Sequence, residues 1–271
     1  MMVICSSVVS IVMNFSNNVI MINKEDKESA DFFFHFTPEI GHLVNIMNNK
    51  FMPFFCMESL EYLNFPELQI KAMAYPMICF CDIPVSRQKE HRVKFGSYGI
   101  GLSKDWGIKN RLTPVVYSHD NSMTSLSMKL LIDLAKILKT NLTEQNFHNF
   151  NMAVSILFCY FKPFKGKMYS KSEKKFSDNI SCFYDEKEWR YFPIELDLLP
   201  MNLTLEQYEN ESMRESSNLK IQGKNRLLFK LADIEYLFLK ERSEKEVFLN
   251  AISEKFSKEE LKVIENKIQY N

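Results

Sequence analysis

Apolar residues along this chain fall into short runs that alternate between the two-residue spacing of strands and the wider spacing of helices. The aromatic run 31–37 predicts a strand buried on both faces, and the apolar residues that follow Pro38 at helical spacing predict a helix. Further strands are expected at 75–82, 96–102, 113–117, 180–184, 188–194, 226–231 and 234–239.

Between these strands the pattern becomes helical from Met123 to about Tyr160, which predicts a helical insertion at about 122–165. A final amphipathic helix is expected from Ser257 to Tyr270. Because strands and helices do not alternate regularly, the order of elements favours an α+β fold over a doubly wound parallel sheet. We expect a single domain over residues 30–271.

Residues 1–29 are expected to form a leader that is apolar up to Ile22. It carries no Lys or Arg before Lys24, and asparagines interrupt its apolar stretch, so neither a signal peptide nor a membrane span is predicted. Met13 and Met21 are alternative start sites for translation. The prediction is a cytoplasmic protein.

The amino-acid composition argues against several classes of binding site. Lys plus Arg and Asp plus Glu each number 34, so net charge gives no argument for binding nucleic acid or a membrane surface. The six cysteines have no paired spacing, which predicts reduced thiols in a reducing compartment. We expect the Cys79 and Cys81 thiols to point to opposite faces of their strand, so that they cannot join His91 in a zinc site. No metal site is predicted.

The first candidate for chemistry is His35 with Thr37. Residues two apart on a strand share a face, so an imidazole and a hydroxyl would point together out of an aromatic segment and could bind a sugar or an amide. The alternative is a core histidine beside a threonine that caps the following helix.

The second candidate is the glycine-rich run around Tyr98. Gly96, Gly99 and Gly101 would let a flat ligand ring lie against the backbone and the aromatic face of Tyr98. The order of the glycines does not match a dinucleotide-binding turn, because no helix pattern follows. A turn followed by an edge strand is the alternative.

The third candidate is the segment that contains Glu186, Glu188 and Arg190. In an extended chain these three side chains would face one way, and Trp189 and Tyr191 would face the other. A carboxylate beside an arginine stays ionised and can stabilise positive charge at an anomeric carbon. The alternative is a ladder of surface ion pairs with Trp189 in the core.

Lysines are concentrated in the segment 162–175, which we expect to be a basic loop. Its lysines are Lys162, Lys165, Lys167, Lys171, Lys174 and Lys175. Such a loop could draw in RNA or DNA, although charge runs are commonly solvated loops without a partner.

Several of these segments occur together in one order and spacing: His35–Thr37, Pro76–Pro84, His91, Tyr98–Trp106, Pro114–Tyr117 and Glu188–Tyr191. In this arrangement the chain resembles the AbiGi family of bacterial abortive phage-resistance proteins. The resemblance covers most of residues 31–240 and is most specific in the blocks CFCDIP and YGIGLSKDW. The leader and the final helix lie outside it.

More distantly, the layout is similar to ADP-ribosyltransferases of the DarT type. That resemblance implies a split mixed or antiparallel sheet with NAD as co-substrate. The residues that it implies for binding NAD are His35, Thr37, Ser97, Gly99, Glu186 and Arg92. Those that it implies for catalysis are Glu188, which would stabilise the oxocarbenium ion, Arg190, and Tyr98, which would stack on nicotinamide.

The leading hypothesis is therefore an abortive-infection toxin that transfers ADP-ribose from NAD to a macromolecule such as RNA or DNA. The alternative is a non-catalytic antitoxin or sensor that binds a partner toxin, because some members of the resembled family carry an antitoxin label. A nuclease is a third hypothesis, for which Asp82, Glu186 and Glu188 would have to cluster around a metal ion.

Overall fold

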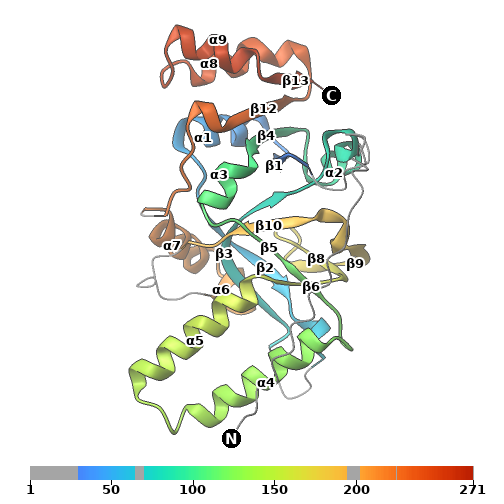
Figure 1. The fold of residues 1–271 in the computed structure, drawn as a ribbon, viewed down its shortest axis with the longest axis vertical. Coiled ribbons are helices and arrows are strands. Elements are labelled where there is room, and N and C mark those ends of the chain that lie inside the picture. The colour runs from blue at the N-terminus through green and yellow to red at the C-terminus, as the bar shows by residue number, and fades with distance from the viewer. Residues whose placement is uncertain (1–29, 65–69, 194–201, 224, 271) are drawn as a thin grey trace, which may run out of the picture.

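A central β-sheet organises the molecule (Figure 1). The computed structural model describes residues 30–64, 70–193, 202–223 and 225–270, and within them this sheet has nine strands. Its main path runs in the order β13 (Ile268–Tyr270), β12 (Ile234–Leu239), β4 (Tyr98–Ser103), β1 (Phe32–Thr37), β3 (Ala72–Cys81), β10 (Glu188–Tyr191) and β5 (Thr113–Pro114). Two further strands, β2 (Phe54–Ser59) and β11 (Leu203–Thr204), pair with β3. The sheet is mixed, because β12 and β13 are parallel and the other pairs are antiparallel.

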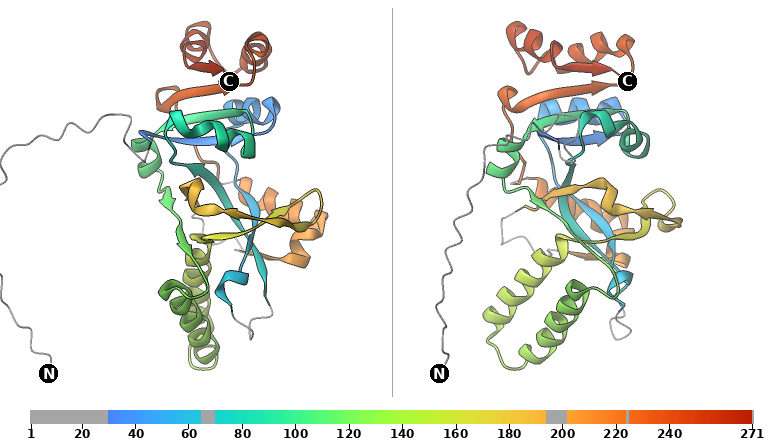
Figure 2. Two further views of the ribbon diagram at one scale, coloured as in Figure 1. Left: turned by 90° about the vertical axis from the view of Figure 1, so that its right-hand side faces the viewer. Right: turned by 45° about the vertical axis from the view of Figure 1, so that its right-hand side comes forward.

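The sheet is nearly divided between β1 and β3. Strand β1 pairs with β4 along its whole length, from Phe32 opposite Ser103 to Thr37 opposite Tyr98. Its pairing with β3 is limited to Phe34 opposite Cys81. Beyond this contact the two strands separate, and the turned views in Figure 2 show the two parts of the sheet diverging. This separation positions the candidate site.

The part of the sheet around β1, β4 and β12 buries a core on one face. Helices α1 (Ile40–Asn49), α3 (Lys104–Lys109) and α8 (Lys245–Ile252) cover it, and its most buried side chains include Phe33, Leu43, Ile100, Leu237 and Phe248. Helix α9 (Lys258–Glu265) adds Ile264 to this core before the chain returns as β13. The C-terminal segment is therefore part of the core and not an appendage.

The opposite face of the same strands is aromatic. Phe34 and Phe36 of β1 lie against Phe238 of β12, at ring-centroid distances of 5.9 and 5.7 Å. The intervening strand β4 carries glycine here, and a Cβ atom at Gly101 would lie 2.7 Å from the Phe34 ring. Glycine is thus required for the rings of β1 and β12 to pack over β4. Helix α2 (Gln88–Phe95) adds the His91 ring, which packs against Phe36.

A helical hairpin projects from the end of the molecule opposite to α8 and α9 (Figures 1 and 2). It consists of α4 (Met123–Leu138) and α5 (Glu144–Cys159). The side chains of Ser122 and Thr143 cap the two helices by accepting backbone N–H groups of their first turns. The hairpin lies between β6 (Val116–Ser118) and β7 (Phe161–Pro163), so the predicted helical segment is present but ends before residue 162.

Five sequence predictions of helices, strands or loops are wrong. Residues 162–175 do not form a loop: Lys162 lies in β7, and β8 (Lys165–Ser170) and β9 (Lys175–Cys182) form a hairpin. Residues 226–230 contain only an isolated bridge between Leu227 and Phe51, and Leu231 begins a 3₁₀ turn. The strand expected at 180–184 ends at Cys182, where another 3₁₀ turn follows. The run 113–117 is divided between β5 and β6, and the segment 257–270 is a helix followed by a strand.

Sequence patterns also missed several elements. These are β2, α2, α3, α6 (Leu205–Glu209), α7 (Glu211–Gln222) and α8. The coarse prediction of a mixed helix and strand fold is confirmed. The expected leader, and the part of the 188–194 strand beyond residue 193, lie outside the described residues. Each described helix is too short or too polar to span a lipid bilayer.

Candidate functional site

A cavity of about 250 Å³ opens where β1 and β3 separate. Its polar lining consists of His35, Glu58, His91, Lys162, Glu186 and Glu188. Aromatic rings and the thiol-bearing residues Cys79 and Cys81 complete the wall. The structure therefore brings together the predicted residues His35, Glu186 and Glu188, which come from distant parts of the sequence.

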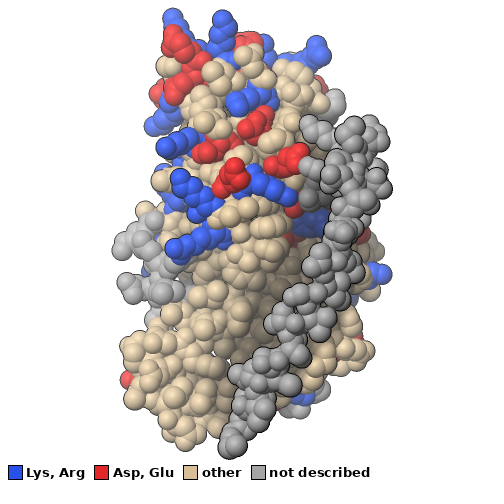
Figure 3. All heavy atoms as spheres, in the orientation of Figure 1, with Lys and Arg blue, Asp and Glu red and all other residues tan. Residues whose placement is uncertain are grey.

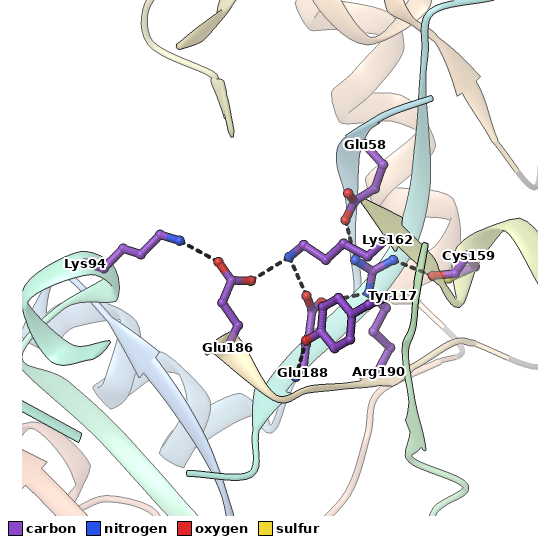
Figure 4. A network of polar contacts seen from close by, with 8 residues as sticks. All are labelled: Glu58, Lys94, Tyr117, Cys159, Lys162, Glu186, Glu188 and Arg190. Atoms are coloured by element: carbon purple, nitrogen blue, oxygen red, sulfur yellow. Dashed lines mark hydrogen bonds and ion pairs between the residues drawn. The ribbon is translucent and has the colours of Figure 1, made fainter. Parts of the chain in front are cut away.

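Six charged side chains at this cavity form one continuous chain of ion pairs with alternating sign (Figure 4). In order they are Lys94, Glu186, Lys162, Glu188, Arg190 and Glu58. The N–O distances between neighbours are 2.5, 2.7, 2.5, 2.7 and 2.5 Å. Three cations thus compensate three carboxylates in a largely buried place.

Local structure explains how two glutamates reach one lysine. Glu186 ends a 3₁₀ turn, Phe183–Glu186, and Lys187 then adopts a left-handed conformation with φ of 45°. The chain enters β10 only at Glu188, so the expectation that Glu186 lies on the same strand face is wrong. Both carboxylates nevertheless contact Lys162. This lysine lies in β7, the strand that follows the helical hairpin in the chain.

Further contacts hold Arg190 and Glu188, two inner members of this chain of ion pairs, in place. The Arg190 side chain is fully buried and donates to Glu188, to Glu58 and to the carbonyl of Cys159. The backbone N–H of Glu188 donates to the hydroxyl of Tyr117 at 2.8 Å. These donors leave Arg190 and Glu188 little freedom to change partners.

The ion pairs decide the charge states in the cavity. Burial by itself would raise the pKa of Glu188, but the charges of Arg190 and Lys162 outweigh burial and hold that pKa well below its ordinary value. Burial would likewise lower the pKa of Lys162, but Glu188 and the neighbouring carboxylates raise it. Burial raises the pKa of Glu58 despite its contact with Arg190.

This electrostatic arrangement predicts a pH dependence of stability. Because the folded-state pKa of Glu188 lies below the ordinary value of 4.5, its ionised form stabilises the fold above pH 4.5. That contribution is lost as the pH falls towards the folded-state pKa. Unfolding of wild type and Glu188→Gln in urea should differ most near neutral pH, and the difference should shrink from about pH 4.5 to about pH 2. A difference that stays constant over this range would contradict the charge state assigned here.

His35 is held by the backbone of β3. Its Nδ1 lies 2.8 Å from the carbonyl oxygen of Cys79, and because a carbonyl only accepts, Nδ1 carries the proton. Burial lowers the pKa of His35, so the ring is neutral. His35 and Cys79 also line a second cavity of about 400 Å³, between β1, β3 and α1. This pair therefore separates two cavities at the point where the sheet divides.

Thr37 lies apart from the cavity lining. It is buried, and its hydroxyl contacts Nδ1 of His42 at 2.8 Å. The expected alternative role as a helix cap is wrong, because Glu39 stands at the N-cap of α1 without a side-chain cap bond. A role for Thr37 in binding a cofactor stays a prediction.

The predicted residues around Tyr98 do not line the cavity between β1 and β3. Tyr98 packs into the core on the α1 face, and its hydroxyl donates to Glu244 at 2.5 Å. Gly99 lies beneath the ring of Phe36, and Arg92 donates to the carbonyl of Ser97 while stacking on Phe238. The expectation that Tyr98 surrounds one slot with His35 and Glu188 is therefore wrong, and the roles proposed for these four residues in binding NAD are untested.

Sequence reasoning missed Lys162, Glu58 and Lys94. Lys162 was hidden in a lysine-rich run whose other members are exposed on the β8–β9 hairpin. The signal that could have found it was its position among the apolar residues Tyr160, Phe161, Pro163 and Phe164. Glu58 and Lys94 had no local signal, because their partners lie 132 and 92 residues away.

The cysteine argument also needs correction. Residues two apart on a strand share a face, and Cys79 and Cys81 line the same cavity. The described part of the chain nevertheless contains no group of three or more side chains that could hold a metal ion. The carboxylate of Asp82, invoked for a nuclease, accepts from the N–H of Ala30 and pairs with Lys104, so its oxygens have partners other than a metal ion shared with Glu186 and Glu188.

Comparisons with known proteins place this chain in a family. Residues 49–240 match a family model described as "Putative abortive phage resistance protein AbiGi, antitoxin". A curated relative from Lactococcus lactis subsp. cremoris, "Abortive phage resistance protein AbiGi", is 31% identical over 228 residues, which are 76% of this chain and 88% of the relative. Both descriptions are of abortive phage-resistance proteins.

The chain belongs to the AbiGi family. The resemblance drawn from its sequence blocks is thereby confirmed. No solved structure matches the chain. The expected likeness of the sheet to that of ADP-ribosyltransferases stays a prediction.

Proposed function

We propose that this protein is the antitoxin of an abortive-infection system and acts by binding its partner toxin, without catalysis. The matching family model is described as an antitoxin, which supports this choice over a transferase. The protein would act in the cytoplasm, in keeping with the free thiols of its five described cysteines.

One observation at the cavity carries the proposal. Each of the four carboxylate oxygens of Glu186 and Glu188 already lies within 2.7 Å of a side-chain nitrogen of this chain. A catalytic glutamate must accept a hydrogen bond from the substrate ribose, and here that bond would displace a buried ion pair. The cluster is thus better suited to holding β7, β10 and β2 together than to turnover.

A growth assay tests the proposal. Expression of this chain alone in a bacterium is expected to leave growth unchanged, and co-expression with the toxin of its abortive-infection system should restore growth that the toxin arrests. The purified toxin should bind this chain directly. Growth arrest by the chain alone, relieved by Glu188→Gln, would overturn the proposal.

A second candidate function is transfer of ADP-ribose from NAD, with a nucleic acid or protein as acceptor. It is favoured by the convergence of His35, Glu186 and Glu188 on one cavity. The volume of about 250 Å³ is smaller than the roughly 300–1,000 Å³ typical of ligand pockets, so NAD would require the two parts of the sheet to open further. Incubation of the chain with radiolabelled NAD and cell lysate separates the two functions, since transfer of label to RNA, DNA or protein is expected only for the enzyme.

A further inference from the structure

Helix α4 exposes a stripe of large apolar side chains along its whole length. The stripe consists of Met123, Leu126, Leu130, Leu134 and Ile137, which are between 41% and 74% exposed. The opposite side of the helix is the one that packs on the body, where Ser125 and Met128 are buried. The apolar stripe therefore has no role in holding the hairpin to the rest of the chain.

The five stripe residues share one side of the helix. Their spacing of three, four, four and three residues keeps them within an arc of about 80° at 3.6 residues per turn. Contiguous apolar surface of this kind marks an interface in water-soluble proteins, because single exposed apolar residues are common but aligned ones are not.

The spacing also has a symmetry. Read from either end of the helix it is the same, and Leu130 stands at its centre. If two antiparallel copies of α4 meet at Leu130, then Leu126 lies opposite Leu134 of the second copy, and Met123 lies opposite its Ile137. A surface that matches itself under a two-fold rotation is what a symmetric dimer requires.

Charge at the edge of the stripe agrees with this register. Lys129 and Asp133 flank the stripe on the same side, and same-side positions face each other in an antiparallel pair of helices. With Leu130 on the two-fold axis, Lys129 of one copy is offset by about 3 Å along the helix direction from Asp133 of the other copy. The two-fold symmetry repeats this contact, so opposite charges meet twice. Asp133 also pairs with Lys136 of its own helix at 2.9 Å, so Lys129 of the second copy would approach a carboxylate that already has one cation beside it.

The second helix of the hairpin, α5, is poor in charge. Helix α5 carries one acidic residue, Glu144, and no Lys or Arg. Figure 3 shows that Lys, Arg, Asp and Glu crowd the part of the molecule around the sheet and leave the visible surface of the hairpin nearly free of them. Depletion of charge is the compositional sign of the core of a protein–protein interface.

We infer that α4 is a two-fold interface through which two copies of this chain associate, antiparallel and centred on Leu130. Together the two hairpins place four helices side by side, two from each copy. A contact along one helix of 16 residues, about 24 Å long, is smaller than a standard interface. The dimer should therefore form reversibly, with a dissociation constant in the micromolar range.

Sedimentation of the full chain over a concentration series tests the interface. Wild type is expected to pass from monomer to dimer, and Leu130→Glu to remain monomeric, because it places two carboxylates at the axis. Leu219→Glu is the matched control, because Leu219 is also a leucine on a helix and is 70% exposed on α7. Circular dichroism verifies that each variant is folded.

Two further variants test the register itself. Lys129→Asp should weaken the dimer at least tenfold, and the double variant Lys129→Asp with Asp133→Lys should restore it. Leu130→Cys should cross-link to its own copy on mild oxidation, and Leu219→Cys should not.

Four results would overturn the inference. These are wild type that is monomeric at every concentration, equal dissociation by both glutamate variants, failure of the charge reversal to restore the dimer, and absence of the Leu130→Cys cross-link. A monomeric wild type whose binding of the toxin is lost in Leu130→Glu would assign the stripe to the toxin instead.

Discussion

Replacement of Arg190 by leucine is expected to lower the free energy of unfolding by about 3–5 kcal/mol. Arg190 is fully buried and contacts the buried Glu188 and the partly buried Glu58, so its loss leaves Glu188 with Lys162 alone and Glu58 without its ion-pair partner. The cost comes chiefly from this uncompensated charge and not from lost packing. Urea denaturation followed by circular dichroism measures it.

Two further variants show whether uncompensated charge causes the loss of stability in Arg190→Leu. Arg87→Leu removes an exposed arginine and should change stability by no more than about 0.5 kcal/mol. The double variant Arg190→Leu with Glu188→Leu removes a cation and an anion together and should recover part of the loss, because apolar replacement of both partners costs less than removal of one. A double variant less stable than Arg190→Leu would mean that packing around Arg190 dominates.

Truncation of Phe248 to alanine is expected to cost about 3–5 kcal/mol, although this residue lies outside the part of the chain that matches the family model. Its side chain is fully buried, and α8 packs on α1 in the core beneath β1, β4 and β12. The cavity left behind would lie inside this core. Thermal or urea unfolding should show one transition shifted as a whole.

The neighbouring Val247 supplies the control, because it lies on the same helix and is 64% exposed. Val247→Ala should change the free energy of unfolding by no more than about 0.5 kcal/mol. If Phe248→Ala instead gave a separate early transition with the main one unchanged, the C-terminal helices would be an independent unit and not part of the core.

Strong periodic patterns predicted the type of several elements correctly. The aromatic run of β1, the apolar runs of β3 and β12, and the helical hairpin from Met123 to Cys159 all appear where the sequence placed them. In each of these the side chains repeat at one spacing over six or more residues, so local preference and burial agree. The short or mixed segments failed, and β13 was taken for the end of a helix because three residues carry too little pattern.

The candidate site was predicted in part. Glu188 and Arg190 are adjacent on one strand face, so their pairing follows from strand geometry alone. The contact of Lys162 with Glu186 and Glu188 joins segments on either side of the β8–β9 hairpin, and no local pattern reports it. The same limit explains why Tyr98 was placed at the cavity, when pairing with β1 turns its side chain to the α1 face.

By itself the sequence determined the family, the principal strands and helices, and three residues of the cavity lining, His35, Glu186 and Glu188. The tertiary structure alone decided that β1 and β3 separate after one pairing, that a lysine from a supposed loop is buried between two carboxylates, and that α4 turns an apolar stripe outward. The reason is physical: local patterns depend on neighbours a few residues apart, whereas charge compensation and exposure depend on groups that only the folded chain brings together.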